Sequence, residues 1–189
     1  MSDLPAEVQS WIGQKRYAME GEFDVERGYV FTSCSSVRNA NPIYWDEKAA
    51  EEITGGFIAP PSMISVWFRP HHWAPGRSEG SVALPLQVHF DLKEALDVPE
   101  AVMSDNTITF GAPVRPGDRL RTWQVLRNVS TPKQTKLGKG HFWDIDVEYV
   151  NQKGEWIGTE SYTGFGYRKD PKGPRSEPRA SEVRTGRGK

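Results

Sequence analysis

The sequence predicts a single α+β domain, with helices in its first half and an antiparallel sheet in its second. The length of 189 residues, with a mass of 21.3 kDa, suits one domain. Apolar residues before residue 70 recur at helical spacing, whereas those after residue 105 alternate with polar ones. Aromatic residues make up 11% of the chain, which is enough to build a core. We expect residues 1–168 to form this domain. Residues 169–189 should be a basic tail without fixed structure, because Gly, Pro, Ser and charged residues dominate there.

Two helices are expected before residue 55. Asp24 can cap a helix over Val25–Val37. Asp46 can cap a second helix over Glu47–Ile53, which the pair Gly55–Gly56 would end. The first helix should bury one face, because its apolar residues recur at helical spacing. That face carries Val30, Cys34 and Val37.

A third helix is expected to start near Pro61 and to end at Pro70. Proline is tolerated in the first turn of a helix and stops it further along. The segment is apolar almost all round, so the helix should be buried. The stretch from Arg69 to Asp105 has an irregular pattern, with a short helix expected at Leu92–Leu96. A connection of this length is often functional.

The second half of the chain predicts four strands joined by turns. Pro116 and Gly117 stand where a type II turn needs them, and Asn151–Gly154 can close a hairpin. In one strand, apolar residues alternate with acidic ones, so one of its faces should be buried. That face carries Trp143, Ile145, Val147 and Tyr149. The expected strands cover Asn106–Phe110, Leu120–Val129, Phe142–Val150 and Trp156–Tyr167.

The composition excludes several classes of protein. Mean hydropathy is −0.63, and no apolar run approaches the roughly 18 residues that a membrane-spanning helix needs. From Arg168 to Lys189 there are eight basic and three acidic residues, so the rest of the chain is acidic overall, which disfavours nucleic-acid binding. The single cysteine excludes an intrachain disulfide. The N-terminus shows no apolar segment of a signal peptide, so we expect a cytoplasmic protein.

The histidines offer one candidate pair for acid–base chemistry. His71 and His72 are adjacent and would point different ways, and no other ligand stands at suitable spacing, so we expect no metal site. His89 and Asp91 stand two residues apart. On a strand they would share a face and could hydrogen-bond as an acid–base couple. An exposed polar pair in a loop accounts for the same two residues.

Several segments carry a resemblance to a known family. They are the loop Asn39–Asp46, the stretch Gly55–Met63 with its Ile-Ala-Pro-Pro sequence, Pro113–Asp118, Gly140–Trp143 and Gly158–Tyr167. Together with the first helix, they make about residues 10–168 similar to the MaoC-like hot-dog family, in its N-terminal, FAS1-like dehydratase branch. The resemblance implies a hot-dog fold, in which a curved antiparallel sheet wraps around a central helix. That helix would be the one that starts near Pro61.

The resemblance also implies a chemistry, the reversible hydration of 2-enoyl thioesters to 3-hydroxyacyl thioesters. Active members carry Asp-x-Asn-Pro-x-His in the loop, and the Asp and His position one water and move its proton. Backbone N–H groups at the start of the central helix hold the thioester carbonyl as negative charge develops. The substrate would be an acyl-CoA or an acyl-carrier thioester, and no other cofactor is implied.

This chain departs from that pattern at both catalytic positions. Asn39 stands at the Asp position and Tyr44 at the His position, while Asn41 and Pro42 match. An amide cannot act as a base, and a phenol titrates near pH 10, far from the range where a general base works best. The prolines at the start of the central helix lack an N–H, so only Ser62 and later amides remain as donors.

We therefore interpret the chain as the non-catalytic subunit of a heteromeric 2-enoyl-CoA hydratase or 3-hydroxyacyl dehydratase. A second hot-dog subunit, in a heterodimer or a dimer of heterodimers, would supply the Asp and the His. Joining the two sheets would also cover an open edge. This chain would shape the acyl tunnel. Its candidate substrate-binding residues are Asn41, Ser62, Met63, Val66 and Trp67, with Phe68 as further lining.

Three alternatives remain open. A homo-oligomeric hydratase would rely on a relocated pair, His89 and Asp91. The chain could instead be an acyl-CoA-binding module without activity, or a thioesterase, since the same fold hosts that reaction. Lys133, Lys136 and Lys139 surround one turn, where they could meet the phosphates of coenzyme A or simply keep the turn soluble.

Overall fold

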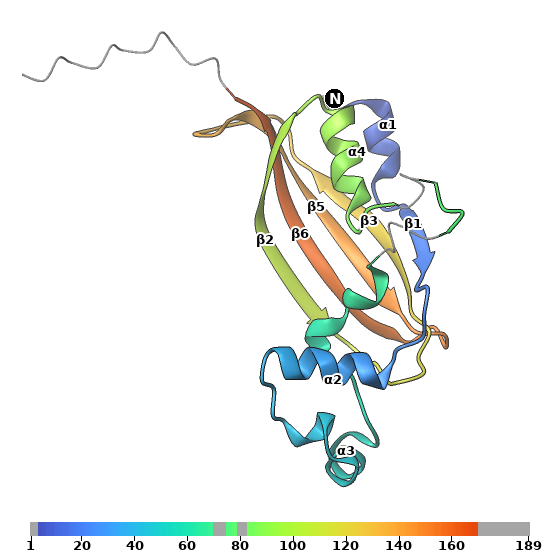
Figure 1. The fold of residues 1–189 in the computed structure, drawn as a ribbon. Coiled ribbons are helices and arrows are strands. Elements are labelled where there is room, and N and C mark those ends of the chain that lie inside the picture. Colours follow the sequence, from blue (N-terminus) through green and yellow to red (C-terminus); the bar gives the residue numbers. More distant parts are fainter. Residues whose placement is uncertain (1–3, 70–74, 79–82, 170–189) are drawn as a thin grey trace, which may run out of the picture.

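A strongly curved antiparallel sheet forms most of the fold, and the helices gather on and below its concave face (Figure 1). The computed structural model describes residues 4–69, 75–78 and 83–169. The strand order is β1-β3-β5-β6-β2, with β4 paired to β5, so β1 and β2 are the two edges. The strands are β1 (Lys15–Glu20), β2 (Glu100–Phe110), β3 (Arg121–Val129), β4 (Lys133–Thr135), β5 (Gly138–Val150) and β6 (Trp156–Arg168). The helices are α1 (Ala6–Trp11), α2 (Arg27–Ser36), α3 (Glu47–Thr54) and α4 (Gln87–Ala95). The α+β class is confirmed.

The central hairpin β5–β6 confirms the alternation predicted for the second half of the chain. The four apolar residues expected on one face of β5 are all at most 3% exposed. Trp143 can lie flat against β6 because Gly164 and Gly166 stand beneath its ring, where a Cβ would overlap the indole. The predicted turn before β3 is also present, with Gly117 at φ +87° and an Asp118 N–H to Arg115 O hydrogen bond of 3.0 Å.

Of the two helices predicted before residue 55, α3 begins where predicted and α2 begins later. The Asp46 side chain caps α3 by accepting from the Ala49 N–H, and Gly55 ends the helix in the left-handed region, as expected. Asp24 does not cap α2, which begins at Arg27, because its carboxylate pairs with Arg119 at 3.1 Å. Val30 and Cys34 are buried on the face of α2, whereas Val37 lies beyond the helix and is exposed.

The expected continuous helix from Pro61 to Pro70 is wrong. The described part of this segment forms two short 3₁₀ turns, Pro61–Met63 and Val66–Phe68. Met63 and Phe68 both reach the core, at 2% and 6% exposed. Five residues apart on an α-helix, they would point about 140° away from each other, so two tight turns bury both where one helix could not.

Helix α4 lies within the stretch Arg69–Asp105, whose sequence pattern is irregular. The short helix expected at Leu92–Leu96 begins instead at Gln87, because the Gln124 amide oxygen accepts the Val88 N–H at 2.9 Å and holds the first turn. Val88 and Leu92 pack with Trp143 in one cluster at the upper end of the sheet. A second cluster, around the 3₁₀ turns and α2, covers the lower end (Figure 1).

Three elements have no counterpart in the sequence-based prediction. They are α1, β1 and β4. Each is short, and β1 is interrupted by a bulge between Arg16 and Met19, so its alternation is too brief to recognise. Residues 170–189, the greater part of the expected tail, lie outside the described residues. Across the described ranges, no helix is long and apolar enough to cross a membrane.

Candidate functional site

The Asn-Pro loop is held by its own side chains. The Asn39 side-chain oxygen accepts the Asn41 N–H at 3.1 Å, and the Asn41 side-chain oxygen accepts the Ile43 N–H at 3.2 Å. The Asn39 carbonyl accepts from the Trp45 indole N–H at 2.7 Å. Both amides therefore shape the loop that leads into α3, which is a common use of Asn side chains.

Tyr44 lies in the core, whereas the loop around it faces solvent. It is 7% exposed and packs in the cluster that includes Cys34 and Val30. Burial raises the pKa of its phenol above the ordinary value, and the nearby Cys34 adds to the shift. At neutral pH this group stays protonated and cannot serve as a base.

The start of the segment at Pro61 offers few amide donors. Pro60 and Pro61 have no N–H, and the N–H groups of Met63 and Ile64 donate to the carbonyls of these two prolines at 2.9 and 3.1 Å. A turn of three residues also lacks the aligned peptide dipoles of a long helix. The geometry provides no developed oxyanion site here.

The residues predicted to line a tunnel do not lie together around one cavity. Ser62 is exposed, and Met63 is part of the core. Val66 and Trp67 border a hollow of about 350 Å³ beside α2, where the Trp67 ring meets Tyr29 edge-on at 5.5 Å. Of the tunnel candidates, Phe68 lines a different hollow, which lies on the concave face of the sheet.

His89 and Asp91 lie on helix α4, not on a strand, so their expected alignment on one face is wrong. His89 is buried and faces Trp143, whose indole N–H donates to His89 Nδ1 at 3.3 Å. Burial lowers the pKa of His89, and the charge of Lys93 lowers it further. Because residues two apart on a helix point about 200° apart, the pair has no common partner.

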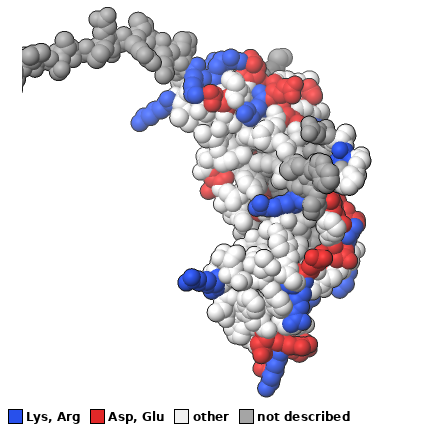
Figure 2. All heavy atoms as spheres, in the orientation of Figure 1, with Lys and Arg blue, Asp and Glu red and all other residues white. Residues whose placement is uncertain are grey.

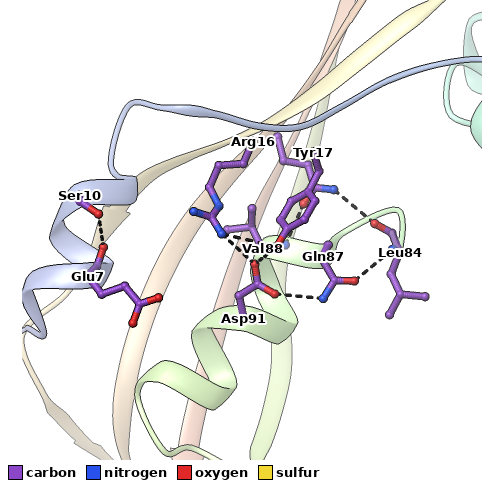
Figure 3. Close-up of polar contacts among 9 residues, drawn as sticks. Glu7, Ser10, Arg16, Tyr17, Leu84, Gln87, Val88 and Asp91 are labelled. Atoms are coloured by element: carbon purple, nitrogen blue, oxygen red, sulfur yellow. Dashed lines mark hydrogen bonds and ion pairs between the residues drawn. The ribbon is translucent and has the colours of Figure 1, made fainter. Parts of the chain in front are cut away.

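Asp91 belongs to a different polar cluster, which ties α4 to β1 (Figure 3). Its carboxylate accepts from the Tyr17 hydroxyl, from Arg16 Nη2 at 3.3 Å and from the Gln87 amide at 3.0 Å. The bulge in β1 puts Tyr17 at φ +52° and turns it out of the ladder toward α4. This cluster fixes α4 on the sheet.

A cavity of about 590 Å³ lies between the concave face of the sheet and the 3₁₀ turns. The walls are mostly apolar, and its described lining residues are Met19, Ser65, Phe68, Arg69, Pro85, Leu86, Met103, Thr122, Gln124, Val147, Tyr149, Glu160 and Tyr162. Inward-facing residues of all five long strands contribute to it. Of these residues, only Phe68 was predicted from the sequence to line an acyl tunnel.

A buried carboxylate stands on the floor of this cavity. Glu160 is 5% exposed, and its Oε2 accepts hydrogen bonds from the Tyr149 and Tyr162 hydroxyls, both at 2.9 Å. Burial raises the pKa of both phenols, and the charge of Glu160 raises them further. The two phenols therefore remain donors. The signal for this group was present in the sequence: Gly158, Glu160 and Tyr162 alternate and share the inner face of β6.

The cavity reaches the open edge of the sheet. Met103 lines it from edge strand β2 and is 44% exposed. Ile108 and Phe110 of β2 are also exposed. In Figure 2 charged side chains gather toward the two ends of the molecule and along the β1 side, while the surface over β2 and α2 is largely uncharged. Apart from Glu100 and Asp105, β2 carries no charge, and an edge of this kind with exposed apolar side chains is a surface suited to another sheet.

Other predicted sites lie apart from the cavity or outside the described residues. Lys133, Lys136 and Lys139 are exposed on the β4–β5 hairpin. His71 and His72 fall outside the described residues. In the ranges that the structure describes, no group of three or more His, Cys, Asp or Glu is placed to hold a metal ion.

Two of the curated proteins that this chain resembles are named as hydratase subunits. A probable enoyl-CoA hydratase alpha subunit of Thermomonospora curvata is 25% identical over 169 residues, which is 88% of this chain and 52% of that protein. The alpha subunit of a 3-oxo-4,17-pregnadiene-20-carboxyl-CoA hydratase of Mycobacterium tuberculosis is 31% identical over 121 residues, 64% of this chain and 37% of that one. The chain thus spans about half or less of the length of these two relatives.

Solved structures show the same fold. The ChsH1–ChsH2 complex of Mycobacterium tuberculosis contains a chain that matches with a TM-score of 0.68 at 21% identity, over 88% of this chain and 94% of that one. A MaoC-like dehydratase of Rhodospirillum rubrum matches with a TM-score of 0.57 at 16% identity, over 85% and 94%. The family model of the FAS1-like dehydratase domain region matches residues 10–160. The chain therefore belongs to the FAS1-like dehydratase family and has its MaoC-like hot-dog fold.

Proposed function

We propose that this chain is the non-catalytic subunit of a heteromeric 2-enoyl-CoA hydratase or 3-hydroxyacyl-thioester dehydratase. One observation carries the proposal: the two positions where the family's acid–base pair would stand hold side chains that have structural roles and cannot act as a base. Asn39 holds a loop, and Tyr44 is a buried phenol with a raised pKa. General acid–base catalysis contributes about 10²- to 10⁴-fold to a rate, and neither group can supply it near neutral pH.

The open β2 edge supports a partner subunit. Strand β2 is 11 residues long, lies at the end of the sheet and carries exposed apolar side chains. Unpaired N–H and C=O groups along such an edge are satisfied when a second sheet joins it. Two relatives are named as alpha subunits, and one structural match is a complex of two named chains. A second hot-dog subunit with an intact Asp-x-Asn-Pro-x-His loop would add the missing pair.

The cavity supports a role in holding the acyl group. It opens beside Met103 at the same edge, so an acyl chain could pass from the partner's site into this subunit. Its largely apolar walls suit a hydrocarbon group. We assign the lining role to Phe68 and to the sheet residues of the cavity, and not to Met63, which is buried in the core.

The test is hydration of 2-enoyl-CoA substrates, followed by loss of enoyl absorbance. This chain alone, the partner alone and the reconstituted complex are compared on short and bulky acyl groups. We expect no turnover by this chain alone, and turnover of bulky substrates by the complex beyond that of the partner. Turnover by the chain alone that disappears in His89→Ala would overturn the proposal and favour a relocated catalytic group.

A further inference from the structure

The carboxylate on the cavity floor has one oxygen without a partner. Both tyrosine hydroxyls donate to Oε2 of Glu160, and within the described part of the chain Oε1 accepts no hydrogen bond. The residue is only 5% exposed, and it lines the cavity. Among the described residues, the fully buried side-chain atoms without a partner are Arg16 Nε and Trp67 Nε1, so Oε1 of Glu160 is not sealed off but opens to the cavity. A ligand that donates to it can replace water there.

The neighbouring polar groups cannot serve this oxygen. Thr122 donates to the Glu148 carbonyl at 2.9 Å, and the Gln124 amide accepts from the Val88 N–H and donates to the Leu84 carbonyl. The hydrogens of Tyr149 and Tyr162 are already given to Oε2. At Glu160 itself the cavity therefore offers an acceptor to a ligand, whereas the donors that line it, Ser65 and Arg69, stand on the 3₁₀ turns.

We propose that the cavity selects acyl groups that carry a hydroxyl, which donates to Glu160 Oε1 from within an otherwise apolar pocket. This inference rests on the proposed function, since it takes the cavity as the place of the acyl group. A ketone or an ester at the same point would set its carbonyl oxygen against Oε1, and neither atom has a hydrogen to donate. An ammonium group would also donate, but it loses far more than a hydroxyl on entering walls formed by Met19, Phe68, Leu86 and Val147.

The cavity walls set where the two ends of such a ligand lie. Glu160 and Tyr162 belong to β6, on the sheet side of the cavity, whereas Ser65 and Arg69 border it from the 3₁₀ turns. The exposed Met103 marks its reach to the β2 edge. Glu160 stands one strand in from this edge, opposite Ile108 of β2. The hydroxyl therefore lies on the part of the acyl group that enters this subunit, and the thioester lies beyond the edge, on the partner's side.

The test measures binding of matched thioesters to the full chain in complex with its catalytic partner. Acyl-CoA probes of rising chain length are compared in three forms that differ at the distal carbon: methyl, hydroxyl and oxo. We expect one chain length at which the hydroxyl form binds on the order of 10-fold tighter than the methyl form, as one buried hydrogen bond gives. The oxo form should gain nothing.

Two variants separate recognition from structure. In Glu160→Gln the amide presents N–H groups, so the preference should pass from the hydroxyl to the oxo form. The matched control is Glu148→Gln, on the opposite face of β5, where the carboxylate meets Trp123 and Arg127; it should keep the wild-type preference. If Glu160→Gln unfolds, a wild-type crystal structure with the hydroxyl probe decides, with the hydroxyl expected within hydrogen-bond distance of Oε1.

The outcomes also separate this inference from the proposed function. Probes that bind with equal affinity in all three forms, or a hydroxyl preference that survives Glu160→Gln, overturn the inference and leave the acyl-holding role intact. A crystal structure with the hydroxyl away from Glu160 does the same. Failure of every probe to bind, at any chain length, overturns the acyl-holding role itself and the inference with it.

Discussion

At the scale of single residues, two glycines, which have no side chain, decide how closely the largest core residue approaches the sheet. Trp143 is fully buried, and its ring lies against Gly164 and Gly166 of β6. The hairpin between β5 and β6 was predicted from the sequence, but the register that sets Trp143 opposite Gly164 was not. The alternation on β5 was readable from sequence, whereas the partner of each side chain across the sheet was not.

Adding one methyl group at Gly166 should therefore destabilise the domain. A Cβ there overlaps the Trp143 ring and approaches Val98, so Gly166→Ala should lower the free energy of unfolding by about 1–3 kcal/mol, the usual cost of overpacking. Gly28→Ala is the control, since a Cβ at Gly28 in α2 meets nothing within 4 Å. It should leave stability unchanged or raise it. Thermal and urea unfolding measure both, and equal stability of the two variants would contradict the packing argument.

His89 should make the fold sensitive to acid. Burial holds its pKa below the ordinary value of about 6.5, so the folded chain binds fewer protons than the unfolded chain once the pH falls below that value. Stability then falls with pH by up to about 1.4 kcal/mol per unit from this group, until the pH passes the lowered pKa.

His89→Gln keeps an acceptor for the Trp143 indole but does not titrate. Between pH 7 and pH 5 we expect urea unfolding to show a smaller loss of stability in this variant than in the wild type. If the two pH profiles run parallel, His89 is not the group responsible, and its assignment as a buried neutral histidine is wrong.

At the scale of elements, helix boundaries set by neighbouring residues were predicted from the sequence, and boundaries set by tertiary contacts were not. Helix α3 was predicted with its Asp46 cap and its Gly55 end, because both signals lie within the element. The segment after Pro61 was predicted as one helix, and its two 3₁₀ turns follow from the need to bury both Met63 and Phe68. Helix α4 was placed too late, since Gln124, far away in sequence, fixes its first turn.

The open edge strand gives the element-scale prediction. Ile108→Lys places a charge on β2, where an incoming strand would have to bury it. This variant should fold as the wild type does but bind the catalytic subunit at least about 10-fold more weakly. Leu137→Lys, at an exposed apolar position on the β4–β5 turn, is the matched control and should bind normally. Sedimentation of the mixtures measures both. An intact complex with Ile108→Lys would place the partner elsewhere.

At the scale of the whole molecule, the fold separates two core clusters, and Phe68, Val147 and Tyr149 of one of them line the cavity. One cluster lies under α4 and the other under the 3₁₀ turns and α2, and Leu86 packs against both. The sequence predicted the class, the family resemblance and the changed loop, which all rest on contiguous residues. It did not predict the cavity, because Phe68 meets Glu160 and Tyr149 only in the tertiary structure, although those two residues lie on the directly paired strands β6 and β5.

The division of labour between two subunits is the central claim, and one measurement tests it most directly. In the reconstituted complex, hydration of a 2-enoyl-CoA is compared after replacing the motif His of the partner by Ala and, separately, after Tyr44→Phe in this chain. We predict that the first change lowers turnover by about 10²-fold or more and that the second leaves it unchanged. Turnover that survives the partner's change but is lost with Tyr44→Phe would show that this chain carries the chemistry itself.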